Sequence, residues 1–381
     1  MTLLCSGVGS FTGIHPFLLV LAAAGLDRLV GDPRWCLHPV VVMGWWIRWL
    51  RQLAEHAAGD RPLALRLAGG VITLLLVGGS AGAGWLLEQA ALQLCRTELL
   101  EPLGPLLLLI ALASALAGRS LEQAVRDVLH ALPAGNPQDN TIGQPNSSDA
   151  QSVHSVQTPR AVSPGADLEP ARRALSWIVG RSTEELNAAE ILRAAAETAS
   201  ENAVDGLFAP LFWMLVGATL WSAGLTGGPG PLCLAWGFKA ASTLDSMLGY
   251  RRGSLRWLGT GGAKLDDLLV WLPCRLVALS LPLVQRRTAR RALSLAQLAL
   301  QEGQPDPSPN AGVSQAIYAH CLGVQLGGVN RYGERETQKP LLAAGAPAPE
   351  ASDVERLLGL SRRLEVLWLA AALLVGAAVH R

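Results

Sequence analysis

The chain has 381 residues, half of them hydrophobic and only 16% charged, and its mean hydropathy is +0.30. This composition is too apolar for an ordinary soluble domain and predicts an integral membrane protein. The 31 basic and 30 acidic residues nearly cancel, and no long basic run is interleaved with aromatic residues. A nucleic-acid partner is therefore not expected.

The apolar segments predict an all-α fold, a polytopic integral membrane protein in which transmembrane helices alternate with helical cytoplasmic motifs. Residues 16–30 form a short first segment that is interrupted by charge. A turn bounded by Gly and Pro then carries Asp32, Arg34 and His38, and it leads into a tryptophan-rich helix that suits a membrane interface. The histidine is either structural or functional, and the sequence leaves both open.

A transmembrane hairpin and a long polar insertion come next. Residues 63–87 form the longest clean span, and residues 103–117 form its partner. Residues 119–132 have the pattern of a charged amphipathic helix. The stretch 133–167 is rich in Pro, Ser, Asn and Gln, which predicts a disordered loop inserted into an otherwise single membrane-embedded domain over residues 1–381.

The stretch RAAAETASENAVDGLFAPLFW, residues 193–213, joins acidic and amide side chains directly to an apolar segment. Glu197, Glu201 and Asp205 are four residues apart, so a helix places them on one face, with Asn202 beside them. This face is either solvated or a site for Mg²⁺ or a cationic substrate group. Its position beside a membrane segment favours the site. A Ser-Thr-Glu-Glu run at 182–185 is typical of a helix start upstream.

Two apolar segments after this stretch are candidates for a second transmembrane hairpin. Residues 203–226 extend the acidic helix into the membrane, and residues 231–248 follow a Gly-Pro turn. The second segment contains Lys239 and Asp245, whose charges are not expected to face lipid.

A further charged motif precedes the apolar segment 265–284. Lys264 ends a glycine-rich bend, and Asp266 and Asp267 follow it. Adjacent aspartates point about 100° apart on a helix, so one can bind a metal while the other caps or pairs. The run GTGGAK lacks the spacing of a nucleotide-binding P-loop, and no predicted strand precedes it.

A last polar motif lies at residues 309–328. Pro309 and Asn310 are typical of a helix start, and two glycines at 327–328 are typical of its end. The unpaired N–H groups at such a start can bind a phosphate, although a well-capped structural helix explains the pattern equally well. The apolar run 364–379 is long enough for a tilted span.

The distribution of Lys and Arg distinguishes two membrane topologies. If 203–226 and 265–284 both cross, the candidate site is divided between the two sides of the bilayer. If 203–226 and 231–248 form the hairpin and 265–284 is interfacial or re-entrant, every charged motif lies on one face. We prefer the second topology.

Five separated motifs occur in order along the chain: GDPRWCLHPV, ETASENAVDGLFAPLFW, KAASTLDSMLGYR, GAKLDDLLVWLPCR and PNAGVSQAIYAHCLGVQLGG. With these motifs the chain resembles the adenosylcobinamide-phosphate synthase family of cobalamin biosynthesis, also called the CobD/CbiB family. The resemblance covers nearly the whole chain except the polar loop, which looks shorter in the family, and the C-terminal tail.

The resemblance implies a multi-pass enzyme of the cell inner membrane with a cytoplasmic active site. Such an enzyme joins adenosylcobyric acid to (R)-1-amino-2-propanol O-phosphate, or a related amino alcohol, and makes an amide bond at the expense of ATP, with Mg²⁺. Its expected partners are the corrinoid, the amino alcohol phosphate, the lipid bilayer and other cobalamin-assembly proteins. The alternative is a membrane transporter for a corrinoid or another anionic small molecule, since charged residues in broken apolar segments also mark transport pathways.

For the ligase we expect three groups of site residues. The catalytic candidates are Glu197, Glu201, Asp245 and Asp267. The metal candidates are Glu201, Asp266 and Asp267. The substrate- and phosphate-binding candidates are Asp32, Arg34, His38, Asn202, Asp205, Lys239, Arg251, Arg252, Lys264 and Asn310.

Overall fold

The computed structural model describes residues 15–32, 38–97, 100–133, 167–250, 252–285, 288–333 and 335–379. Arg34, Arg251 and almost all of the predicted loop at 133–167 lie outside the described residues.

The described chain is helical apart from one hairpin of two strands. Its elements are α1 (Pro16–Val30), α2 (Pro39–Ala58), α3 (Pro62–Leu94), α4 (Leu103–Ala113), α5 (Gly118–Ala131), α6 (Glu169–Ser176), α7 (Ala188–Ala203), η2 (Val204–Phe208), α8 (Ala209–Ser222), α9 (Pro231–Leu248), α10 (Leu255–Leu258), α11 (Thr260–Val284), α12 (Ala289–Gly303), α13 (Ala311–Leu322), β1 (Leu326–Tyr332), β2 (Arg335–Leu342) and α14 (Ala351–Val379).

Four helical stretches are long and apolar enough to cross a membrane: Pro62–Leu94, Leu103–Ala131, Ala188–Ser222 and Thr260–Val284. The predicted all-α polytopic membrane fold is therefore confirmed. Thr260–Val284 is as long and as apolar as a span, so its length and hydropathy do not support the interfacial or re-entrant segment of the preferred topology. That topology stays a prediction.

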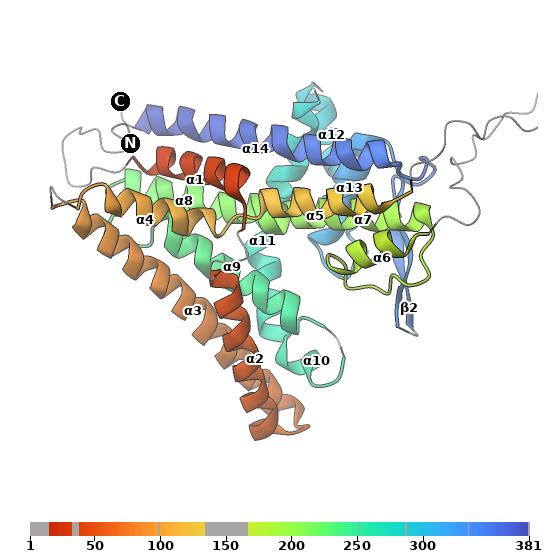
Figure 1. The fold of residues 1–381 in the computed structure, drawn as a ribbon, viewed down its shortest axis with the longest axis horizontal. Coiled ribbons are helices and arrows are strands. Elements are labelled where there is room, and N and C mark those ends of the chain that lie inside the picture. Colours follow the sequence, from red (N-terminus) through yellow and green to blue (C-terminus); the bar gives the residue numbers. More distant parts are fainter. Residues whose placement is uncertain are drawn as a thin grey trace, which may run out of the picture.

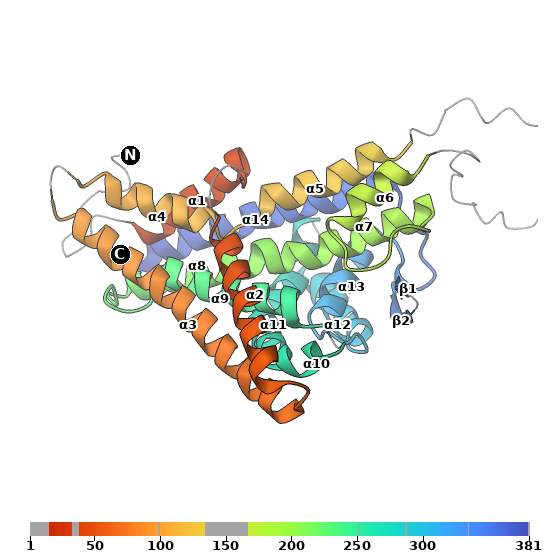
Figure 2. The same ribbon diagram turned by 60° about the horizontal axis from the view of Figure 1, so that its bottom comes forward.

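The long helices lie side by side along one axis of the molecule, and a helical hairpin projects from them (Figure 1). Helix α14 and the continuous α7–η2–α8 helix run the length of the body, with α1 and α5 beside them. Helices α2 and α3 form the projecting hairpin (Figure 2), and α9 and α11 lie between this hairpin and the body.

Small residues in the core let helices approach closely, as is usual in membranes. A Cβ at Gly84 on α3 would lie 2.9 Å from Cys233 Cα on α9, and one at Gly69 would lie 2.0 Å from Leu258 O. Larger side chains at these positions would push α3 off its neighbours.

The helix that carries the acidic stretch contains a π turn. Residues Val204–Phe208 bond with π spacing, and the carbonyl of Gly206 accepts a hydrogen bond from Ala117 N at 2.9 Å. A π turn widens the helix and often occurs at functional sites. Here it includes Asp205.

Two predicted helix ends are wrong. The helix after the 182–185 run starts at Ala188, and the side chain of Asn187 just before it accepts a hydrogen bond from Glu190 N in a reciprocal capping box. Residues 182–185 stay outside the helix because Ser182 is bonded to the β-hairpin: its N donates to Arg331 O at 2.9 Å, and its Oγ accepts from Gly333 N at 2.9 Å. The helix at 310 ends at Gly323, which takes the left-handed conformation, and the glycines at 327–328 belong to β1.

Candidate active site

One face of α7 carries the acidic residues that the sequence predicted together. Arg193, Glu197, Glu201 and Asp205 follow one another at spacings of four residues, and they stay neighbours into the π turn, because Asp205 interacts electrostatically with Glu201. The prediction of a shared carboxylate face is therefore confirmed by the fold.

Glu197 is the most enclosed of these carboxylates, with a side chain 1% exposed. Arg181 Nη2 donates to its Oε2, and Gly327 N donates to its Oε1 at 2.9 Å. Both oxygens are thus engaged in ties between α7, the turn at 181 and the β-hairpin. Glu197 therefore joins α7 to the turn at 181 and to the β-hairpin, and its catalytic role stays a prediction.

Glu201 lies where α7 meets α13 and β2. Its Oε2 accepts a hydrogen bond from Gln315 Nε2 at 3.0 Å, and it attracts Lys339 of β2. Lys339 Nζ is also 3.0 Å from Asp306 Oδ2. Burial alone would lower the pKa of Lys339, but the nearby Glu201 and Asp306 outweigh it and raise the pKa, so the lysine stays charged at neutral pH.

Four aspartates and glutamates from three helices meet around the π turn. Asp205 interacts electrostatically with Asp266 of α11, Glu201 of α7 and Asp245 of α9, and Lys239 of α9 lies among them as the opposite charge. Asp266 is 9% exposed, and its Oδ1 has no hydrogen-bond partner within the described chain. Carboxylates crowded in this way favour the binding of a cation.

Asp267 faces the loop before α13. Ser308 Oγ donates to Asp267 Oδ1 at 3.3 Å, and Asn310 Nδ2 donates to Asp267 O at 2.8 Å. Arg275 in turn donates to the Asn310 side-chain oxygen and, at 3.2 Å, to Pro309 O. The motifs at 262–275 and 309–328 thus form one polar unit.

The turn before α2 adds a contact between a histidine and an aspartate to the same region. His38 Nε2 is 3.2 Å from Asp32 Oδ1, and His38 Nδ1 accepts from Val40 N at 3.3 Å, so the ring proton belongs on Nε2. Partial burial raises the pKa of Asp32, but the contacts with His38 and Ser120 hold it below its ordinary value. Asp32 also attracts Lys239.

Two predicted phosphate-binding residues stand apart from this cluster. Arg252 is exposed and stacks over the Tyr250 ring at 5.1 Å, and Lys264 is exposed at the start of α11. Within the described residues neither forms an ion pair with a cluster carboxylate. Asn202 is half-buried next to Glu201.

Sequence reasoning missed several polar residues of the cluster. Gln315 was inside a quoted motif, but a glutamine in a helix gives no charge signal. Arg181 and Lys339 lie in segments without a motif, and only the fold brings them to Glu197 and Glu201.

The carboxylates suit a metal ion only in part. Among the residues that the structure describes, no three His, Cys, Asp or Glu side chains are placed to hold a metal by themselves. Mg²⁺ commonly binds one or two carboxylates together with substrate phosphates and water. The unpartnered Asp266 Oδ1 and its neighbour Asp245 fit such a partial site.

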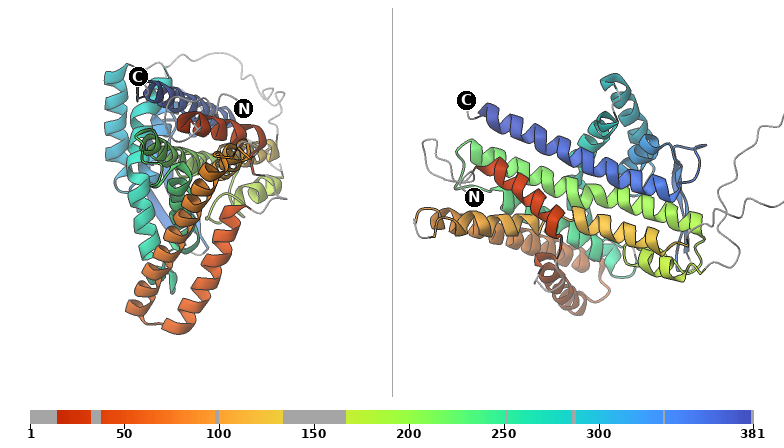
Figure 3. Two further views of the ribbon diagram at one scale, coloured as in Figure 1. Left: turned by 90° about the vertical axis from the view of Figure 1, so that its left-hand side faces the viewer. Right: turned by 45° about the horizontal axis from the view of Figure 1, so that its top comes forward.

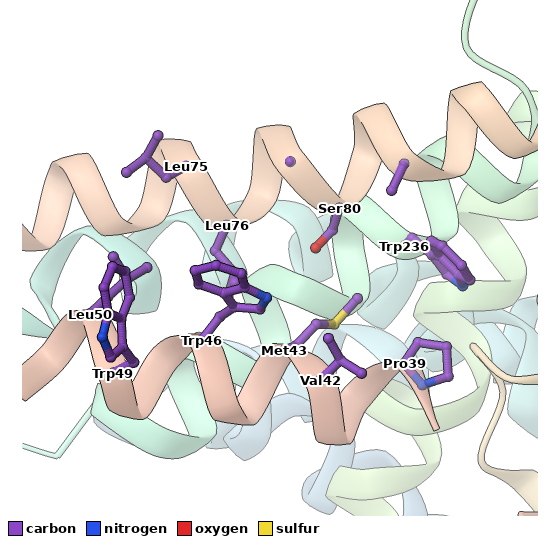
Figure 4. A pocket seen from close by; sticks show the side chains of 12 residues that line it. Pro39, Val42, Met43, Trp46, Trp49, Leu50, Leu75, Leu76, Ser80 and Trp236 are labelled. Carbon is purple, nitrogen blue, oxygen red and sulfur yellow. The ribbon is translucent and has the colours of Figure 1, made fainter. Parts of the chain in front are cut away.

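A separate apolar cavity of about 600 Å³ lies between α2, α3 and α9 (Figure 4). Trp46 and Met43 of α2 line it, with Leu76 of α3 and Trp236 of α9. The cavity is mostly apolar, its polar groups are the Ser80 hydroxyl and tryptophan N–H groups, and no charged side chain lines it. The polar cluster, and not this cavity, is therefore the candidate active site.

The fold and the cluster define a helical membrane protein with a charged site built from several spans and their connections. The chain matches the model of the family described as CobD/Cbib protein over residues 20–141 and 150–361. It belongs to this family of cobalamin biosynthesis proteins. The gap in the match lies inside the predicted loop insertion.

Curated relatives share the family over most of their length. The chain is 35% identical to "Cobalamin biosynthesis protein CobD" of Synechocystis sp. over 93% of this chain and 91% of the relative. It is 34% identical to the protein of that name from Geobacter metallireducens, over 85% of each, and 32% identical to "Cobalamin biosynthesis protein CbiB" of Salmonella typhi, over 91% and 92%. No solved structure matches the chain.

Proposed function

We propose that this protein is an acid–amine ligase that makes adenosylcobinamide phosphate. The substrates are adenosylcobyric acid, an amino alcohol phosphate such as (R)-1-amino-2-propanol O-phosphate, and ATP. The observation that carries the proposal is the cluster of Glu201, Asp205, Lys239, Asp245 and Asp266, which three helices gather next to apolar spans. Membership of a cobalamin biosynthesis family supports the substrate class.

Amide formation from a carboxylate and an ammonium is uphill in water, so the carboxylate must first be activated. The corrinoid carboxylate oxygen attacks the γ-phosphorus of ATP, ADP leaves, and an acyl phosphate forms. The amine nitrogen then attacks the acyl carbon, and inorganic phosphate leaves with the C–O electron pair. Both steps place negative charge on phosphate oxygens. The second step also takes two protons from the nitrogen, one before the amine attacks and one as the amide forms, and the released phosphate can carry one of them away as hydrogen phosphate.

The chain's own residues fit these requirements. Lys239 and Lys339 are the cluster's cations and would attract the phosphate and carboxylate oxygens. Glu201 would accept the ammonium proton, since its side chain is half-buried and held by Gln315. Asp245, Asp266 and Asp267 would hold Mg²⁺ together with the phosphates, and Mg²⁺ supplies charge neutralisation when ATP binds.

We place the enzyme in the cell inner membrane with this cluster on the cytoplasmic side, because ATP is cytoplasmic and the Lys and Arg residues gather around these motifs. Other cobalamin-assembly proteins are natural partners on that side, since the product continues through the pathway.

The test is direct synthesis. The purified protein in detergent is incubated with adenosylcobyric acid, amino alcohol phosphate and Mg·ATP, and the amide is detected by mass spectrometry. We expect product only when all components are present, together with ADP and phosphate. A protein that instead carries unchanged corrinoid into sealed vesicles, and makes no amide, would be a transporter.

A further inference from the structure

A polar cavity of about 570 Å³ opens between the turn at residues 181–186, the start of α7 and the β-hairpin. These elements lie together at one end of the molecule (Figure 1). Arg181, Arg193 and Arg331 contribute to the lining, with Asn330 of β1. None of the family motifs described above accounts for this cavity.

The cavity presents buried donors that lack partners. Asn330 is 2% exposed, and its Oδ1 accepts from Arg181 Nη1 at 2.7 Å, while its Nδ2 has no hydrogen-bond partner in the described part of the chain. Arg193 Nε is likewise buried without a hydrogen-bond partner there, but it lies 4.0 Å from Glu197 Oε1 in an ion pair. A buried donor that stays unsatisfied destabilises a fold, so Asn330 Nδ2 indicates a place for an anionic ligand.

The lining selects among phosphate-bearing ligands. Four glutamates share the cavity with the three arginines and would repel a nucleoside triphosphate with its several negative charges: Glu184, Glu185, Glu190 and Glu336. The apolar lining consists of Leu186 and Val329, and no aromatic side chain is among the described lining residues, so a purine has no stacking surface. A small phosphomonoester that also carries an ammonium group fits this mixture of charges.

The cavity also adjoins the cluster where the amide would form. Arg181 lines the cavity and donates to Glu197, and Lys339 attracts both Glu197 and Glu201. Four residues of α-helix rise about 6 Å, so Glu201 lies within the length of a small amino alcohol phosphate from the position of Glu197.

We propose that this cavity binds the amino alcohol phosphate, with the phosphate on Arg181, Arg193 and Asn330 and the ammonium directed along α7 toward Glu201. The inference rests on the proposed ligase function and adds the position of one substrate. It assigns the phosphate of the amine substrate, and not that of ATP, to the cavity.

The substitution Asn330→Asp tests the assignment. Aspartate keeps the oxygen that accepts from Arg181, and it replaces the unpartnered donor by a second oxygen with negative charge. The control is Gln338→Glu, which adds a charge to the same hairpin at an exposed residue opposite Val329, outside the lining. Binding of the amino alcohol phosphate, of the unphosphorylated amino alcohol and of ATP is measured by calorimetry on the full chain in detergent.

We expect Asn330→Asp to weaken binding of the amino alcohol phosphate about 10- to 100-fold, the range for loss of a charge-assisted hydrogen bond. Binding of the unphosphorylated amino alcohol and of ATP stays unchanged, and the control binds all three like wild type. The assignment would be overturned if Gln338→Glu weakened binding of the amino alcohol phosphate equally. It would also be overturned if Asn330→Asp weakened binding of ATP instead, or left binding of the amino alcohol phosphate unchanged. If wild type makes no amide while the phosphate-specific binding loss persists, the ligase function fails and the phosphate cavity stands.

Discussion

The substitution Glu201→Gln separates a chemical from a structural role for the carboxylate at the centre of the site. A glutamine oxygen can still accept the hydrogen bond that Gln315 donates at 3.0 Å. Lys339 keeps its ion pair with Asp306 at 3.0 Å. The change also relieves repulsion from Glu197, so we expect the unfolding free energy to change by no more than about 1 kcal/mol.

The catalytic effect should be far larger. Glutamine cannot take the ammonium proton, and loss of a general base lowers kcat roughly 10²- to 10⁴-fold. The assay compares kcat for amide formation with the Tm of the same preparation. Glu350→Gln is the matched control, because Glu350 is exposed just before α14 and should behave like wild type. Near-normal kcat in a Glu201→Gln protein with a lowered Tm would show that the carboxylate is structural and refute this reasoning.

Four further predictions concern Arg181, Asp32, the polar loop and the membrane topology. Arg181→Met should destabilise the protein by about 3–5 kcal/mol, because it leaves the buried Glu197 unpaired, and the double variant with Glu197→Gln should recover much of the lost Tm. The pKa of Asp32 is lower in the folded protein than in the unfolded chain, where it is about 3.9. The ionised Asp32 therefore stabilises the fold above the unfolded pKa, and this stabilisation is lost as pH falls through the folded pKa. In Asp32→Asn the Tm should fall less steeply in melts below about pH 4. Replacing residues 133–167 by a short Gly/Ser linker should leave Tm and amide synthesis near wild type, since that composition cannot offset the entropy of ordering, and loss of activity would contradict this. Ser254→Cys should react with a membrane-impermeant thiol reagent only from the cytoplasmic side, and labelling from the periplasmic side would exclude the preferred topology.

The sequence predicts those parts of the site that a single helix fixes. Spacings of four residues place Glu197, Glu201 and Asp205 on one face whatever the rest of the fold does, and the structure has them there. Apolar length likewise predicts the spans, because a bilayer requires about 20 apolar residues from a helix.

The parts that depend on tertiary contact could not be predicted in this way. The strands at 326–332 and 335–342 have no run of alternating apolar residues, and they are tied in place by Arg193, which donates to Val329 O at 2.8 Å. Lys339 joins the site only because this hairpin forms. A lysine in a polar segment gives no sign of that in the sequence.

Buried carboxylates in this membrane protein fall into two kinds, and the hydrogen-bond donors around each distinguish them. Glu88 on α3 is fully buried, and its two oxygens accept from the backbone N–H groups of Gly230, Leu232 and Cys233 at 3.0, 2.6 and 3.1 Å. It caps the start of α9, so its demand for donors is met within the fold.

Asp266 is buried to a similar degree but meets the opposite environment. Its Oδ1 accepts no hydrogen bond from the described residues, and its neighbours include the carboxylates of Asp245 and Asp267. Three backbone donors satisfy the buried Glu88, which shows that this fold can pair a buried carboxylate with donors. An unsatisfied Asp266 among like charges destabilises the fold. Proteins keep such an arrangement at functional sites, where a bound ligand offsets the destabilisation. Asp27 and Glu365 also have one buried oxygen without a partner, but the other oxygen of each accepts a hydrogen bond, from Gly118 N at 3.1 Å and from Arg28 Nε at 2.7 Å. The like charges around Asp266 therefore give a structural reason to assign the chemistry to the α7–α9–α11 cluster.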